Sequence, residues 1–90
     1  MSAIDPTAHR ELIDLQAASD AAQRRLLAYR PEPGTSPADE DGVRRQLRVA
    51  ASEAAEAKNT ALDASGLAST APGGRHQVNV DLRNAARARE

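Results

Sequence analysis

Residues 43–64, VRRQLRVAASEAAEAKNTALDA, decide how this chain folds. Apolar residues recur there at alternating intervals of four and three, which places them on one face of a continuous helix. The face is made almost entirely of alanine, which favours helix formation strongly but buries little apolar area. Such a helix forms readily and gains stability only where another backbone approaches it closely. The face consists of Val43, Leu47, Ala50, Ala54, Ala57, Ala61 and Ala64.

The residues that flank this segment define the two ends of a long helix. Ser36 can cap the N-terminus, and Pro37 suits the first helical position, where its missing N–H is not needed. The acidic residues 39–41 fit the positive end of the helix dipole. Gly66 is a natural C-terminal stop. We therefore predict a helix that begins near residue 37 and ends near residue 65.

A second helix is predicted before the proline-rich stretch. Asp5 can cap its N-terminus with Pro6 at the first helical position. The helix should end near Tyr29, because a residue that precedes a proline, here Arg30, is disfavoured in helical geometry. Its spacing repeats the four-three rhythm of the first helix, with Ile13 and Leu27 widening the apolar face. That face consists of Ala8, Leu12, Leu15, Ser19, Ala22, Leu26 and Tyr29.

Residues 31–37 contain three of the five prolines and can continue neither helix. We read them as a stiff turn that allows the two helices to pair antiparallel. In that register Leu26 lies near Leu47, whereas Leu15 and Leu12 lie near Ala57 and Ala61, so large side chains face small ones along most of the seam. The predicted fold is all-α, with residues 1–66 forming an antiparallel helical hairpin.

The apolar material for a core is limited. Leu, Ile and Val together number 14, Tyr29 is the only aromatic residue, and the formal net charge is −1. Two helices leave part of each apolar face wet, so we expect oligomerisation or a partner protein to complete a helical bundle. An outer apolar edge that includes Ile13, Leu27, Val49 and Leu62 should meet that partner. The predicted interface comprises Leu12, Ile13, Leu15, Leu26, Leu27, Tyr29, Val43, Leu47, Val49, Ala50, Ala54, Ala57, Ala61 and Leu62.

The composition changes after the hairpin. Residues 67–76 are rich in Ser, Thr, Ala, Pro and Gly and are predicted to form a flexible linker. Residues 77–90 fit either a short strand, from the alternation of Val78, Val80 and Leu82, or a helix. We favour a short third helix from about Asn79, with a tail as the alternative. Residues from 71 onward carry a net charge of +2 and could dock on a neighbouring helix or remain an ordinary soluble tail.

The sequence contains no pattern that carries catalysis. The chain has no cysteine, and its two histidines, His9 and His76, do not occur at the spacing of a helical metal site. No serine lies in a nucleophile motif, and no glycine-rich loop fits a phosphate. We predict no catalytic residue, no metal and no cofactor.

Arginines gather where the hairpin is predicted to turn. Several of them follow an acidic residue by four positions, which is typical of a self-neutralised, solvated face. Nucleic acid is not an expected partner, because the chain has no excess of positive charge and no aromatic stacking platform. The alternative is an enzyme or ligand-binding protein with an intersubunit site for an anionic small molecule. The arginines of that site would be Arg24, Arg25, Arg44 and Arg48.

The leading functional prediction is a non-catalytic interaction or assembly module that binds itself or another protein. Its role would be structural, in a larger particle for example. The N-terminus lacks the basic and apolar regions of a signal peptide, and no apolar run approaches the roughly 20 residues that cross a bilayer. We therefore expect no membrane partner and a cytoplasmic location or incorporation into a larger assembly. No small molecule is assigned.

Overall fold

The capping residues around the alanine-rich segment produce the longest helix of the chain. In a computed structural model, which describes residues 4–89, α2 spans Pro37–Ser65. The Ser36 side chain accepts a hydrogen bond of 3.1 Å from the backbone N–H of Asp39. Gly66 ends the helix with a φ of 75°, a left-handed conformation that glycine adopts without steric cost. Both ends lie where the sequence predicts them.

The helix before the proline-rich stretch, α1, spans Arg10–Ala28 and therefore begins later than predicted. Asp5 does act as a cap: its Oδ1 atom accepts hydrogen bonds from the backbone N–H groups of Thr7 and Ala8 at 2.8 and 2.9 Å. The capped segment is a single turn, because His9 leaves helical geometry with φ −110° and ψ 28°. The regular helix starts only after His9.

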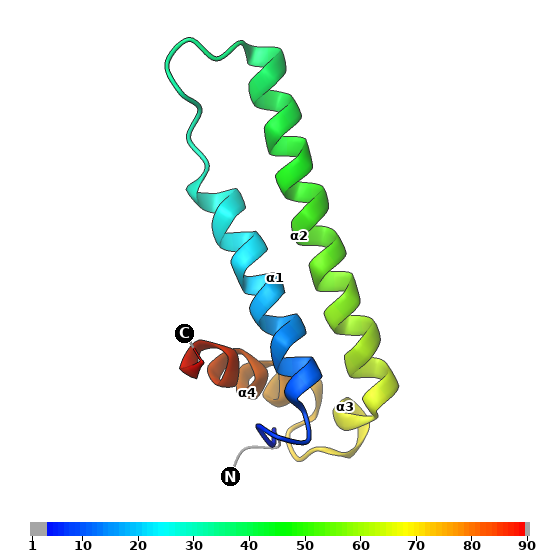
Figure 1. Cartoon of the computed structure of the whole chain (residues 1–90). Helices are drawn as coiled ribbons and strands as arrows, with labels where there is room; N and C mark the ends of the chain where they lie inside the picture. The colour runs from blue at the N-terminus through cyan, green and yellow to red at the C-terminus, as the bar shows by residue number, and fades with distance from the viewer. Residues whose placement is uncertain (1–3, 90) are drawn as a thin grey trace.

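α1 and α2 run side by side in opposite directions and are joined by the proline-rich loop (Figure 1). Two further helices follow, α3 at Leu67–Thr70 and α4 at Gly74–Ala88. α4 packs against α1 and α3 across the end of the pair that is remote from the loop (Figure 1). Every regular element among residues 4–89 is a helix, so the prediction of an all-α chain is confirmed.

The C-terminal segment is a helix rather than a strand, and α4 begins earlier than Asn79. Gly73 and Gly74 have φ values of 85° and 69°, and this pair of left-handed residues turns the chain sharply before the helix. A Cβ atom on Gly73 would lie 2.8 Å from the Cβ of Gln77, so the turn also needs the absence of a side chain. Residues 67–76, the predicted linker, thus contain α3 and the start of α4. Residues 1–3 and 90 of the predicted segments lie outside the described residues.

The hydrophobic core lies at the end of the pair where α4 crosses it. α4 contributes Val78, Leu82 and Ala86, which recur every four residues and are buried on one face. Leu62 of α2 is 0% exposed in the same core. The core cluster of buried residues consists of Ile4, Leu12, Ile13, Leu62, Val78, Leu82 and Ala86.

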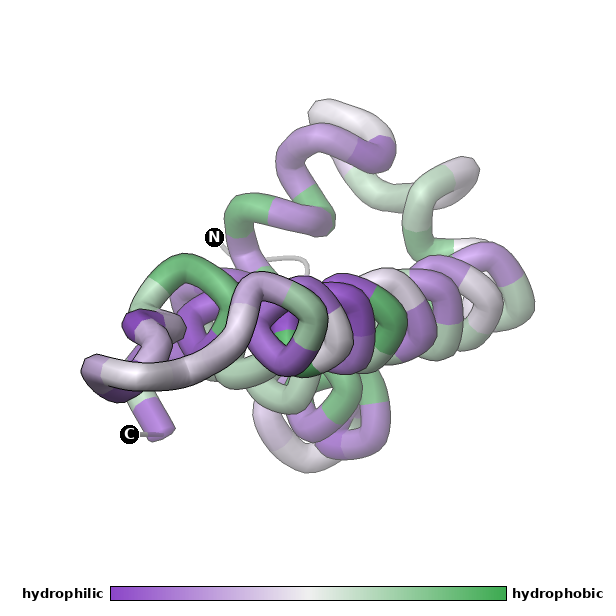
Figure 2. The backbone as a smooth tube through the Cα atoms, turned by 90° about the horizontal axis from the view of Figure 1, so that it is seen from above, coloured by the Kyte–Doolittle hydropathy of each residue, from purple (hydrophilic) through white to green (hydrophobic). Residues whose placement is uncertain are grey.

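The prediction that Ile13 and Leu62 lie on an outer apolar edge of the hairpin is wrong, because both are part of this core. Ile13 and Leu62 were expected to meet another copy or a partner, but they are 2% and 0% exposed. The physical reason is that α4 folds back over them, so their apolar surface is used within the chain. Beyond α4 the pair continues as a narrow extension, and the described chain measures 51 × 23 × 19 Å. Figure 2 shows short hydrophobic stretches separated by hydrophilic ones along its helices.

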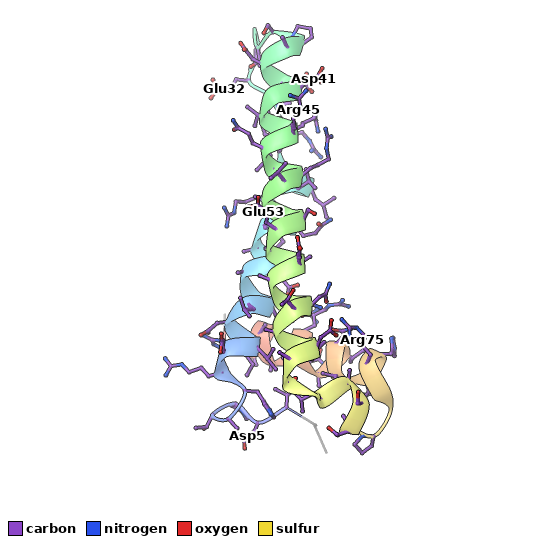
Figure 3. All side chains as sticks on the ribbon, turned by 90° about the vertical axis from the view of Figure 1, so that its right-hand side faces the viewer. Asp5, Glu32, Asp41, Arg45, Glu53 and Arg75 are labelled. Atoms are coloured by element: carbon purple, nitrogen blue, oxygen red, sulfur yellow. The ribbon has the colours of Figure 1, made fainter. Side chains whose placement is uncertain are left out.

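Polar contacts hold α4 in place at both of its ends. Arg75 pairs with Asp63 of α2, and Arg89 pairs with Asp14 of α1. Figure 3 shows Arg75 at the base of the molecule, close to the end of α2. Arg75 and Arg89 of the basic C-terminal segment, for which the sequence leaves docking or a free tail open, are therefore docked on helices of the same chain.

Candidate functional site

A shallow groove of about 550 Å³ lies between α1 and α2. Its floor is apolar because Leu15 of α1 and three alanines of α2 contribute to its lining. Short alanine side chains fill little of the space beside the two backbones, so the groove stays open. Its rim carries carboxylates. The residues that line the groove are Glu11, Leu15, Glu53, Glu56, Ala57, Thr60, Ala61 and Ala64.

The groove lies on the side of the pair that α4 does not cover. Thr60 and Ala64 are each two residues away from Leu62, which corresponds to a rotation of roughly 200° around an α-helix. Leu62 is buried in the core that α4 completes, so these two groove residues point to the other side of α2. Glu53 lies farther along α2, toward the loop end (Figure 3).

Large apolar side chains are exposed toward the loop end of the pair, where α4 does not reach. Leu27 is 66% exposed, Val49 49% and Val43 37%. The Arg44 guanidinium lies 5.1 Å from the centre of the Tyr29 ring and donates hydrogen bonds of 3.1 and 2.9 Å to Glu40. This cation–π contact joins Tyr29, at the end of α1, to Arg44 of α2.

The predicted interface residues fall into three groups by exposure. The structure buries the first group in the core of the chain: Leu12, Ile13 and Leu62. A second group is half-buried between the helices: Leu15, Leu26, Tyr29, Leu47, Ala54 and Ala61. The third group is exposed and available to a partner: Leu27, Val43, Val49, Ala50 and Ala57.

The four arginines of the predicted anion site do not act as one group. Arg44 is paired with Glu40. Arg25 follows the groove residue Glu11 by 14 positions, close to four whole turns, so it lies on the groove side of α1. Arg48 precedes Leu62 by 14 positions and therefore lies on the opposite side of the pair. Arg24 lines a cleft with two arginines of α4 that the sequence does not single out.

The sequence did not single out Lys58, and it pointed to the arginines of α4 only as part of a basic segment that could dock on a neighbouring helix. The Nζ atom of Lys58 donates a hydrogen bond of 3.0 Å to Oδ1 of Asn79. Burial, followed by the charges of Arg75 and Arg83, lowers the pKa of Lys58, and Asp20 opposes this effect. One pattern in the sequence could have identified the basic surface of α4. Positions four residues apart lie near one another on a helix, and this spacing relates Arg75, Asn79, Arg83 and Arg87.

Another cleft, of about 480 Å³, lies between the N-terminal turn and the end of α4. Its lining includes Pro6, Ile13 and the cations Arg10 and Arg89. Arg89 is paired with Asp14 of α1.

Among residues 4–89, no group of three or more histidine and carboxylate side chains is placed to hold a metal ion. Within the same residues, no helix combines the length and the apolar character needed to cross a membrane. In the comparisons with known proteins, no family model, no curated protein and no solved structure matches this chain.

Proposed function

We propose that this chain is a non-catalytic interaction module, in which α1 and α2 form a helical hairpin that a partner protein or another copy completes as a bundle. A structural role in a larger assembly would follow. The observation that carries the proposal is the apolar groove with its glutamate rim. Val49, 49% exposed, precedes Glu53 by one helical turn and extends the same side of α2.

The chemistry of the groove favours one kind of occupant, an amphipathic helix with basic residues beside its apolar face. The alanine floor lets another helix approach closely, since interhelical distance depends on the side chains at the contact. The rim glutamates Glu11, Glu53 and Glu56 attract basic residues. Two copies that met groove to groove would set these glutamates against each other, so the occupant comes from a partner protein.

Synthetic helical peptides test this proposal directly. The probe is a peptide of roughly 18 residues, or five turns, with leucine and alanine on one face and lysine on the flanks. Its control has glutamate in place of lysine. We expect the basic peptide to bind more tightly and to shift the NMR signals of Leu15, Ala57 and Ala61. Equal binding of both peptides, or shifts confined to other surfaces, would contradict the proposal.

Two matched variants locate the binding site. Ala57→Gln places a longer side chain in the groove, whereas Ala38→Gln makes the same change at an exposed position in the first turn of α2, outside the groove lining. The first variant should weaken peptide binding and the second should leave it unchanged. Sedimentation of the unmodified chain over a range of concentrations tests self-association. A dimer that Ala57→Gln abolishes and Ala38→Gln retains would identify a second copy as the occupant and overturn the basic-helix assignment.

A further inference from the structure

A small cleft of about 270 Å³ opens between α1 and α4. α1 contributes Asp20, Gln23 and Arg24 to its lining, and α4 contributes Arg83 and Arg87. The two contributing segments are far apart in sequence, so the packing of α4 on α1 creates this concentration of guanidinium groups. Asp20 is the one carboxylate among the described residues that line the cleft.

The positive charge continues beyond the cleft onto α2. Arg75 and Asn79 precede Arg83 at intervals of four on the same side of α4, and Asn79 accepts the hydrogen bond from Lys58. Asp63 offsets Arg75 through their ion pair. In the cleft lining, the three arginines Arg24, Arg83 and Arg87 accompany one carboxylate, that of Asp20.

The lowered pKa of Lys58 supports a positive electrostatic potential on this side of α4. Its pKa is lowered from the usual value of 10.5 by burial first and then by the charges of Arg75 and Arg83. Asp20 acts in the opposite direction but does not cancel these effects. A bound anion would relieve the repulsion among these cations.

We propose that the cleft between α1 and α4 binds the phosphate groups of a small molecule. Guanidinium groups present several N–H donors in a planar fork that matches phosphate oxygens, and charge-assisted hydrogen bonds are the stronger kind. The volume of about 270 Å³ lies just below the range of roughly 300–1,000 Å³ found for pockets of drug-sized ligands. The cleft therefore suits a diphosphate or a similarly small phosphorylated group, and the proposal is independent of the groove between α1 and α2.

A duplex nucleic acid fits these observations less well. The whole chain has a net charge of −1, and Tyr29, its only aromatic residue, is held by Arg44 near the loop. The guanidinium groups also occupy a corner between two helices instead of an extended surface. Nucleic-acid affinity depends on many phosphate contacts, which a cleft of this size cannot supply.

Titration with inorganic pyrophosphate, followed by NMR and calorimetry, tests the proposal. Inorganic phosphate serves as the smaller probe, and acetate and a short DNA duplex serve as comparison ligands. We expect pyrophosphate to bind with the highest affinity and to shift the signals of Gln23, Arg83 and Arg87. Absence of these shifts at millimolar pyrophosphate, or tighter binding of the duplex than of pyrophosphate, would overturn the proposal.

Paired arginine variants provide the matched control. The double variant Arg83→Gln with Arg87→Gln should weaken pyrophosphate binding at least tenfold, because each guanidinium contributes charge-assisted hydrogen bonds. The double variant Arg25→Gln with Arg45→Gln lowers the net charge equally at exposed positions outside the cleft lining and should leave binding within about twofold. Far-UV circular dichroism confirms that both variants remain helical. If both double variants lost the same pyrophosphate affinity, net charge alone would explain the loss, and the assigned site would be overturned.

Replacing Asp20 by asparagine tests the proposal through an expected increase in the affinity for pyrophosphate. The Nε2 atom of Gln16 donates a hydrogen bond of 2.8 Å to Oδ1 of Asp20, and an asparagine can still accept this bond. Asp20→Asn removes one negative charge from the cleft, so pyrophosphate should bind about threefold more tightly. Unchanged or weaker binding in this variant would contradict the proposed position of the phosphate groups.

Discussion

The ammonium group of Lys58 in α2 donates a hydrogen bond of 3.0 Å to the Oδ1 atom of Asn79 in α4. The contact joins two helices whose bonded residues lie 21 positions apart, next to the core residue Val78. Partial burial and two neighbouring guanidinium groups disfavour the charged lysine and lower its pKa. Asn79 therefore supplies an acceptor for a cation that other cations surround.

Replacing Asn79 by alanine should loosen the docking of α4. Asn84→Ala is the matched control, because the same substitution at an exposed position of the same helix brings the same gain in helix propensity. Asn79→Ala should have a free energy of unfolding about 1 kcal/mol lower than Asn84→Ala, the usual contribution of a hydrogen bond. Urea titrations monitored by circular dichroism measure the difference. Equal stabilities would show that the contact does not hold α4.

Truncation of Leu62 tests whether α4 and the α1–α2 pair share one core. Leu62→Ala leaves a cavity at a fully buried position and should cost about 2–5 kcal/mol. Leu27→Ala makes the identical change where the side chain is 66% exposed, and it should stay within about 0.5 kcal/mol of the parent chain. Thermal and urea unfolding report both effects. Similar losses in the two variants would contradict the position of the core.

The sequence predicted the two long helices because their ends depend on local chemistry. Ser36 and Gly66 act through hydrogen bonds and backbone conformations that involve only nearby residues. The start of α1 was predicted less well, since Asp5 caps one turn and His9 then interrupts the helical geometry. A capping residue alone does not specify how far the helix continues.

The docking of α4 could not be predicted in the same way. The alternation of Val78, Val80 and Leu82 fits a strand, whereas Val78, Leu82 and Ala86 fit one face of a helix, and neither period says which surface these residues cover. The buried position of Ile13 depends on that long-range contact, as does the cleft of Arg24 with Arg83. Leu15 and Ala57 line the same groove, and the antiparallel arrangement of the two long helices was the basis on which the sequence predicted that they lie near each other.

Replacement by alanine should change the stability in opposite directions at Gly42, inside α2, and at Gly66, which caps its C-terminus. Gly42 lies inside the helix, and a Cβ atom built there meets no atom within 4 Å, so Gly42→Ala should stabilise the chain by about 1 kcal/mol. Gly66 has a φ of 75°, where an alanine is strained, so Gly66→Ala should destabilise it by about 1 kcal/mol. Urea unfolding of both variants measures the two shifts. Stabilisation by Gly66→Ala would contradict the left-handed end of α2.

The Asp5 cap should give the N-terminal turn a specific response to acid. Hydrogen bonds from the backbone N–H groups of Ala8 and Thr7 lower the pKa of Asp5 from its usual 3.8. A carboxyl group with a lower pKa in the folded state stabilises that state above pH 3.8, and this contribution is lost as the pH falls through the folded-state pKa. In an NMR titration, the Asp5 side chain and the amides of Thr7 and Ala8 should share a midpoint below 3.8. Asp5→Asn keeps an acceptor but cannot ionise, so the two amides should lose that titration step, whereas a parent midpoint at or above 3.8 would show that the cap is not formed in solution.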